Sequence, residues 1–95
     1  MKTITIHLSG AAAALSGTRA IELALENNAT YADVIRKMGE IYPALIGLII
    51  DQDGHTMLSS NFFQLSEQEF ILHGMWDLIP KDGAVLTLIS PITGG

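Results

Sequence analysis

The sequence contains no cysteine and few charged residues, and both absences narrow the possible function classes. Without cysteine the chain has no disulfide, no thiolate metal ligand and no cysteine nucleophile. Only 16% of its 95 residues are charged, and the basic ones are Lys2, Arg19, Arg36, Lys37 and Lys81. Nucleic acids are bound by clustered Lys and Arg, and these five form no tract, so we expect no nucleic-acid binding. The formal net charge of −5 favours a basic protein partner instead.

Long apolar runs are also missing. None approaches the roughly 20 residues that span a bilayer, and no secretory signal precedes the first strand pattern. A chain without cysteine fits a reducing compartment, so we expect a cytoplasmic protein without membrane association. The apolar fraction is 48%, which is enough to build the core of one domain.

Alternating apolar and polar residues predict two strands near the start of the chain. They cover residues 2–8 and 19–25, and each places three aliphatic side chains on one face. We expect the two strands to pair as a hairpin. The intervening residues 9–18 are small, and their four-alanine run is too short to hold a helix alone, so a turn or flexible loop is predicted.

One amphipathic helix is predicted from Tyr31 to Tyr42, because apolar side chains recur there at three- and four-residue spacing. Thr30 is placed to cap its start, Asp33 favours the positive helix end, and Pro43 limits the other end. The apolar stripe of this helix should pack against the strands. The expected core includes Val34, Ile35, Met38, Ile4, Ile6, Val85 and Leu88.

The middle of the chain is less regular. Residues 45–50 are continuously apolar, which predicts a buried strand, and Asp53-Gly54 predicts a turn after it. Within residues 59–72 the pattern is hard to interpret, but Ser66 and Glu69 fit a capping box, which favours a short helix.

The last part of the chain predicts an irregular turn and then a strand. Residues 74–80 should turn with Met75 and Leu78 pointing inward, and residues 81–83 should form a tight turn. Residues 84–89 are apolar at nearly every position, as in a strand buried on both sides at the sheet centre. The resulting order predicts an α+β fold, with one main helix packed on one face of a mixed sheet.

No side-chain constellation indicates catalysis or a resident metal. The three histidines, at positions 7, 55 and 73, are scattered, and residues 51–54 fail the spacing of a calcium loop. Trp76 is interpreted as a partly buried core residue, with a partner contact as the alternative. Since no acid, base and nucleophile occur together, we expect a protein that is not an enzyme, with no metal site and no cofactor of its own.

The final residues carry the most specific signal. Pro91 should stop the last strand from extending its ladder, and Gly94-Gly95 can adopt backbone conformations closed to other residues. Five residues from Pro91 reach roughly 17 Å when extended, enough to insert the Gly95 carboxylate into another protein's active site. We therefore expect a domain over residues 1–90 and a flexible tail over residues 91–95.

Residues 72–95 resemble the end of the MoaD/ThiS family of sulfur carriers. The shared pattern is a buried Leu, a Lys-Asp-Gly turn, an apolar strand and a Pro-x-x-Gly-Gly ending. Its most specific piece is the run from Ser90 to Gly95. Ala84 departs from the pattern, because an Asp usually follows the turn in this family, and residues 59–72 depart from it too.

The resemblance implies a ubiquitin-like β-grasp fold and a chemical role for Gly95. In this family a partner enzyme adenylates the terminal carboxylate with ATP, and sulfur transfer then yields a thiocarboxylate. ATP would bind the activating partner. The sulfur would pass to an acceptor enzyme in cofactor synthesis, with a molybdopterin synthase large subunit favoured over thiamin or cysteine pathways. The tail residues expected to enter a partner's active site are Pro91, Ile92, Thr93, Gly94 and Gly95.

Two other interpretations stay open. The chain could be a ubiquitin-like modifier joined through Gly95 to lysines of target proteins. It could also be a β-grasp interaction module in which the two terminal glycines are incidental. The first alternative shares the activation step with the sulfur carrier and differs in product, whereas the second predicts no activation.

Overall fold

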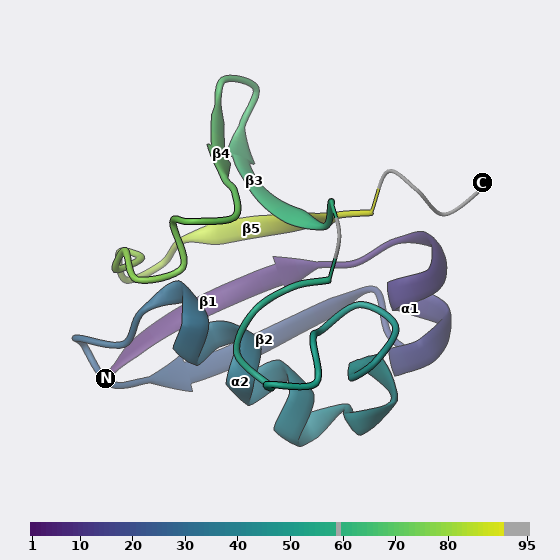
Figure 1. Cartoon of the computed structure of the whole chain (residues 1–95). Helices are drawn as coiled ribbons and strands as arrows, with labels where there is room; N and C mark the ends of the chain where they lie inside the picture. Colours follow the sequence, from purple (N-terminus) through teal and green to yellow (C-terminus); the bar gives the residue numbers. More distant parts are fainter. Residues whose placement is uncertain (59, 91–95) are drawn as a thin grey trace.

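A five-stranded mixed sheet with the strand order β2-β1-β5-β3-β4 forms the centre of the molecule (Figure 1). The computed structural model describes residues 1–58 and 60–90. The strands are β1 (Lys2–His7), β2 (Ala20–Leu25), β3 (Phe62–Ser66), β4 (Glu69–Ile71) and β5 (Val85–Ile89). Strand β1 runs antiparallel to β2 and parallel to β5, and β3 runs antiparallel to both β5 and β4. The predicted mixed sheet with the last strand at its centre is confirmed.

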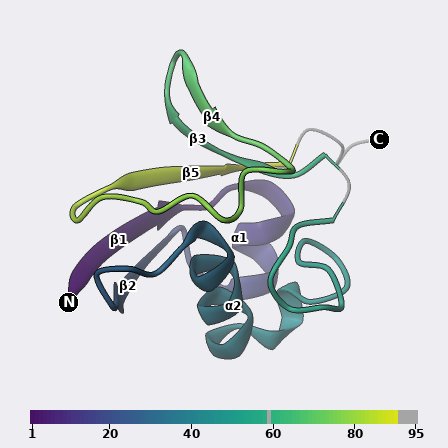
Figure 2. The same ribbon diagram turned by 60° about the vertical axis from the view of Figure 1, so that its left-hand side comes forward.

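Helix α2 (Tyr31–Ile41) packs across one face of this sheet (Figure 2), as the sequence predicts. Its start is closed by a capping box. The Thr30 hydroxyl accepts a hydrogen bond from the Asp33 N–H at 3.3 Å, and the Asp33 carboxylate accepts one from the Thr30 N–H at 2.9 Å. The stripe of the helix that faces the core is fully buried at Val34, Ile35 and Met38.

Residues 10–16 form helix α1 (Gly10–Ser16), so the predicted loop between the first two strands is wrong. Ala12 is fully buried, and this tertiary packing supplies the stability that a short alanine run lacks on its own. Gly17 ends the helix at φ 77°, where its N–H donates to the Ala13 carbonyl oxygen at 2.8 Å. The two strands pair as predicted, but a helix joins them.

The predicted strand over residues 45–50 is also wrong. This segment begins with the 3₁₀ turn η1 (Pro43–Leu45) and continues as turns, in which Gly47 takes φ 93°. The Gly47 N–H donates to the Ile50 carbonyl oxygen at 2.7 Å, so the chain folds back on itself instead of extending. The prediction of burial is confirmed for Leu45, Ile49 and Ile50, which lie in the core, and is wrong for Leu48, which is 63% exposed. The predicted turn at Asp53-Gly54 is confirmed as well.

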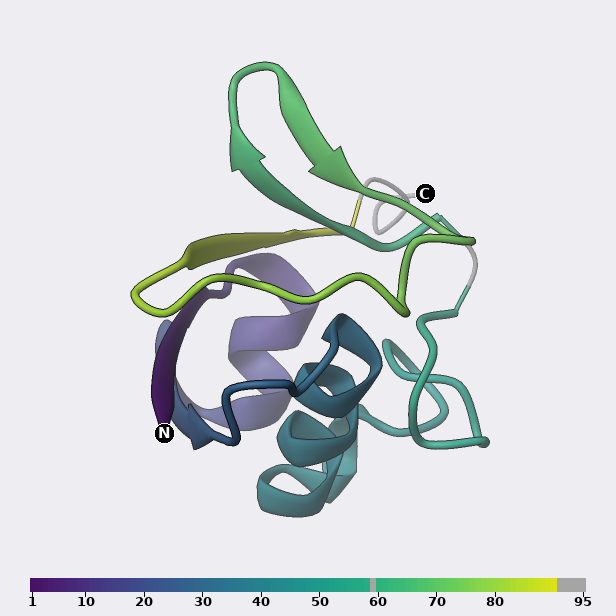
Figure 3. The ribbon, with the colours of Figure 1, turned by 90° about the vertical axis from the view of Figure 1, so that its left-hand side faces the viewer.

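Residues Ser66 to Glu69 form the turn of the β3–β4 hairpin, not the start of a short helix. The Gln68 N–H donates to the Ser66 hydroxyl at 3.4 Å, a local side-chain bond typical of turns. The register shifts between Gln64 and Ser66, and the hairpin rises away from the rest of the sheet (Figure 3).

Two predictions of burial are wrong, one on the open face of the sheet away from α2 and one in the loop before β5. Along β5, Leu86 and Leu88 are buried, but Val85 is 50% exposed, so the strand is central without being buried on both sides. Leu78 is 47% exposed instead of pointing inward. Its loop contributes Trp76 to the core instead, where the indole meets the Phe63 ring edge-on at 6.1 Å. The predicted turn over residues 81–83 is confirmed.

Lys2, the first residue of β1, is a buried cation. Its Nζ donates to the carbonyl oxygens of Asn27 at 3.0 Å, Ala29 at 2.8 Å and Pro80 at 2.8 Å. Burial lowers the pKa of the Lys2 amine, while nearby carboxylates oppose that shift. All three ammonium protons are used, so Lys2 ties β1 to the loops before α2 and before β5.

Within residues 1–58 and 60–90, no helix has the length and apolar character needed to cross a membrane.

Candidate functional site

Strand β5 leads directly to the candidate tail. It is paired on both sides, with β1 through residues 85–87 and with β3 through residues 87–89, which fixes its direction within the sheet. Ser90 follows it and is the last described residue. The predicted site residues Pro91, Ile92, Thr93, Gly94 and Gly95 lie outside the described residues. Their roles therefore stay predictions, and the described site is the surface from which the tail departs.

Asn61 lies beside this departure point, and sequence reasoning missed it. Its side chain is buried, and the Ser90 hydroxyl donates a hydrogen bond to its Oδ1. Its Nδ2 donates to the Leu58 carbonyl oxygen at 2.7 Å and to the Ile49 carbonyl oxygen at 3.4 Å. The sequence signal is weak, since a lone amide before two phenylalanines fits no periodic pattern.

The open face of the sheet carries an outer apolar patch, formed by Phe62, Phe70 and Ile89. Side chains alternate along a strand, so these residues face away from the buried Phe63 and Leu86. The Phe62 and Phe70 rings meet edge-on at 5.8 Å, and Phe62 is paired with Ile89 in the register. The patch therefore reaches the end of β5, and apolar surface beside a departing tail is suited to partner contact.

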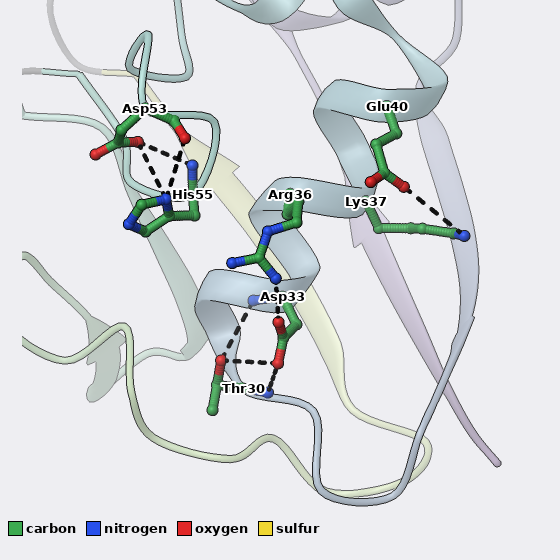
Figure 4. A network of polar contacts seen from close by, with 7 residues as sticks. All are labelled: Thr30, Asp33, Arg36, Lys37, Glu40, Asp53 and His55. Carbon is green, nitrogen blue, oxygen red and sulfur yellow. Dashed lines mark hydrogen bonds and ion pairs between the residues drawn. The ribbon is translucent and has the colours of Figure 1, made fainter.

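The polar clusters elsewhere are local structural devices. Figure 4 shows the Thr30–Asp33–Arg36 cap and the Asp53–His55 turn on separate segments. The Asp33 pKa is lowered, first by the Thr30 backbone N–H and further by Arg36. The Asp53 pKa is lowered, first by the Thr56 hydroxyl and further by backbone N–H groups of the same turn. Among the residues that the structure describes, no group of three or more His, Asp or Glu could hold a metal ion.

Ser90 lines neither of two larger surface hollows. One, of about 660 Å³, lies between β1, α1 and β2, and its charged lining residue is Arg19. The other, of about 610 Å³, lies at the start of β5, beside Tyr31 and Glu69. Burial raises the pKa of the Tyr31 hydroxyl, and Glu69 adds to the shift, so Tyr31 stays neutral near pH 7.

The topology and the helix-covered sheet are those of the ubiquitin-like β-grasp fold. No family model matches the chain, and no curated protein matches it. Solved structures do match. The crystal structure of the small archaeal modifier protein SAMP1 from Haloferax volcanii has a TM-score of 0.80 at 20% identity, over 98% of this chain and 99% of that one.

Two further structures share the fold from end to end. A Pyrococcus furiosus protein described as molybdopterin converting factor subunit 1 has a TM-score of 0.71 at 18% identity, over 97% of this chain and all of that one. Urm1 from Trypanosoma brucei has a TM-score of 0.66 at 18% identity, over 99% and 96% of the two chains. The resemblance drawn from residues 72–95 is thus confirmed at the level of the fold.

Proposed function

We propose that this chain is a ubiquitin-like sulfur carrier whose Gly95 carboxylate is activated by a partner enzyme. One observation carries the proposal: the central strand of a β-grasp domain leads, through Ser90, into the Pro-Ile-Thr-Gly-Gly sequence. The same fold in a molybdopterin converting factor subunit supports it.

The proposed chemistry requires that Gly95 carries a free carboxylate when it meets the activating enzyme. A carboxylate oxygen of Gly95 attacks the α-phosphorus of ATP, pyrophosphate leaves, and an acyl-adenylate forms. A hydrosulfide ion then attacks the acyl carbon, AMP leaves, and loss of the sulfur-bound proton gives the thiocarboxylate. If the donor is instead a persulfide, its outer sulfur attacks, AMP leaves, and a thiol then cleaves the resulting acyl disulfide, which releases the thiocarboxylate and leaves the donor sulfur in a disulfide with that thiol. The glycine acyl group is unhindered, which favours both attacks. ATP and its Mg²⁺ would be held by the partner, and this chain would supply the tail and a docking surface.

Docking of the activating enzyme would use the surface around Ser90. The outer apolar patch borders the end of β5, and the net charge of −5 favours a basic rim on the partner. The acceptor would be a cytoplasmic sulfur-using enzyme. A molybdopterin synthase large subunit is the favoured acceptor, and the thiamin and cysteine pathways are alternatives.

A second candidate is a protein modifier joined through Gly95 to lysines of targets. The structural likeness to SAMP1, a small archaeal modifier protein, favours it. Activation would be the same, but a lysine amine would attack the acyl carbon in place of sulfur. The remaining alternative is a β-grasp interaction module that binds through the sheet face and is never activated.

Intact mass analysis of the protein from its native cells separates these functions. A sulfur carrier gains the mass difference between one sulfur and one oxygen, located at Gly95 by fragmentation. A modifier is recovered in adducts with an isopeptide bond between Gly95 and a lysine. A variant lacking Gly95 is the matched control, because it should show neither product. An unmodified intact chain under conditions that demand sulfur transfer would contradict both activated functions.

A further inference from the structure

We propose that Asn61 is a positioning residue for the activation of Gly95. Its buried amide holds Ser90, the last described residue, and so fixes the point from which the tail continues. The inference rests on the proposed function, because a tail that is never activated needs no fixed starting point.

Strand register places Asn61 and Ser90 opposite each other. The last regular pair between β3 and β5 is Phe62 with Ile89, so the next rung of the ladder would pair Asn61 with Ser90. At this rung the Ser90 hydroxyl donates to the Asn61 Oδ1. A side-chain hydrogen bond thus restrains the chain one residue beyond the last regular β3–β5 pair.

The amide can hold Ser90 because it is itself anchored. Its Nδ2 donates to the Leu58 carbonyl oxygen at 2.7 Å, and its backbone N–H donates to the same oxygen at 3.2 Å. The Leu58 N–H in turn donates to the Ile49 carbonyl oxygen at 2.9 Å. Ile49 is 3% exposed and Met57 is 2% exposed, so this loop is fastened to the core.

The orientation of the amide is therefore determined. Both N–H donors of the side chain point at loop carbonyls, which leaves Oδ1 as the acceptor that faces Ser90. Aspartate cannot replace it, because a carboxylate offers no donors to those carbonyls. Removing a hydrogen-bond partner from a buried, fully hydrogen-bonded polar side chain costs free energy. Such side chains therefore favour one local geometry.

A fixed departure point should matter for binding more than for the chemical step. When the tail enters a partner's channel, every residue that was not already held in place loses backbone conformational entropy. The free-energy cost of ordering one residue corresponds to about a five- to thirty-fold loss of affinity. Releasing Ser90 adds about one residue to that cost. Once the tail is threaded, the channel itself aligns the carboxylate with ATP, so the maximal rate should be preserved.

The test measures ATP–pyrophosphate exchange by the cognate activating enzyme against carrier concentration, at a temperature well below every melting transition. Asn61→Ala and Ser90→Ala should each raise KM about five- to thirty-fold at unchanged kcat. The double variant should be no worse than the poorer single variant, because both remove the same bond. Ser90→Thr keeps the hydroxyl and should retain most of the wild-type KM. Asp33→Ala is the matched control, since it weakens a helix cap on a different segment.

Three results would overturn the positioning role while the intact chain still supports exchange. These are an unchanged KM in both alanine variants, fully additive effects in the double variant, or an equal rise in KM for Asp33→Ala. If the intact chain supports no exchange with its activating enzyme, the proposed function itself fails and the positioning role falls with it. The wild-type measurement therefore separates the two failures.

Discussion

The Lys2 ammonium donates a hydrogen bond to the Pro80 carbonyl oxygen at 2.8 Å and joins residues 78 positions apart. The same nitrogen holds two carbonyls of the loop before α2. The loop at residues 76–78 also accepts two hydrogen bonds from the start of that helix. The Tyr31 N–H donates to the Leu78 carbonyl oxygen at 3.0 Å, and the Ala32 N–H donates to the Trp76 carbonyl oxygen at 2.8 Å. The beginning of α2, the beginning of β1 and the approach to β5 therefore form one hydrogen-bonded unit.

Replacing Lys2 with methionine should destabilise the domain strongly. Methionine keeps much of the aliphatic volume but leaves three carbonyl oxygens without their donor. We expect the free energy of unfolding to fall by about 2–4 kcal/mol, measured by urea denaturation at pH 7. Lys37→Met is the control, because Lys37 is exposed on α2 and should change stability by less than about 0.5 kcal/mol. Equal effects of the two substitutions would contradict the role of Lys2.

Asp33→Ala should reduce stability in a pH-dependent way. The folded-state pKa of Asp33 is lowered by the Thr30 N–H and by Arg36, so its stabilising effect is complete above the unfolded pKa and is lost as pH falls through the folded pKa. We expect a loss of about 1 kcal/mol at pH 7 and a shrinking difference from wild type below about pH 4. Thermal melts across this range test the prediction. Glu40→Ala, at an exposed ion pair, should have little effect at any of these pH values. A difference that stays constant down to pH 2 would argue against the cap.

Deleting Gly95 should abolish adenylation and leave the fold intact. The buried core lies within residues 4–88, and the shortened tail would end about 3.5 Å short of the partner's ATP. Gly94→Val should impair activation less completely, by adding bulk and removing backbone freedom. ATP–pyrophosphate exchange and a thermal melt of each variant make the test. Exchange at the wild-type rate after the deletion would rule out both the sulfur carrier and the modifier.

Phe70→Ser should weaken recognition by the activating enzyme without unfolding the domain. Phe70 is 38% exposed and contributes an edge-on ring to the outer apolar patch. If the patch contacts the partner, losing this ring should raise KM in the exchange assay by about tenfold or more. Leu48→Ser is the matched control, because Leu48 is 63% exposed on the loop that follows η1. A wild-type KM for Phe70→Ser would exclude the patch from the interface.

Helices and strands whose apolar residues follow a clear pattern could be predicted from the sequence. Elements that depend on tertiary contacts for their stability could not. The first two strands and α2 each show an apolar stripe that matches their geometry, and β5 is a continuous apolar run of strand length. Helix α1 shows neither pattern, because its stability comes from the burial of Ala12 and the left-handed Gly17. The apolar run at residues 45–50 has strand-like composition. Pro43 and Gly47 favour turns, and in the folded protein their effect outweighs the strand propensity of the apolar residues.

For the candidate site as well, one part could be predicted from the sequence and another part could not. The tail was predicted from composition and from a family resemblance carried by residues 90–95. The surface around its departure point was not, because it combines segments distant in sequence. Asn61 meets Ser90 29 positions later, and Phe62 meets Phe70 across a hairpin that the sequence suggested as a helix. Such pairings depend on register, which no local pattern of this chain specifies.

The parallel pairing of β1 and β5 also has a mechanical consequence. The two strands pair at Thr5–Val85, Ile6–Leu86 and His7–Thr87, so Met1 and Ser90 lie toward opposite ends of the same ladder. A force that pulls on the tail while the start of β1 is held would load these rungs in shear. They would then have to rupture together, whereas the rungs of a hairpin pulled open at its ends break one after another. The domain is therefore built to resist traction along the direction in which its tail would be drawn.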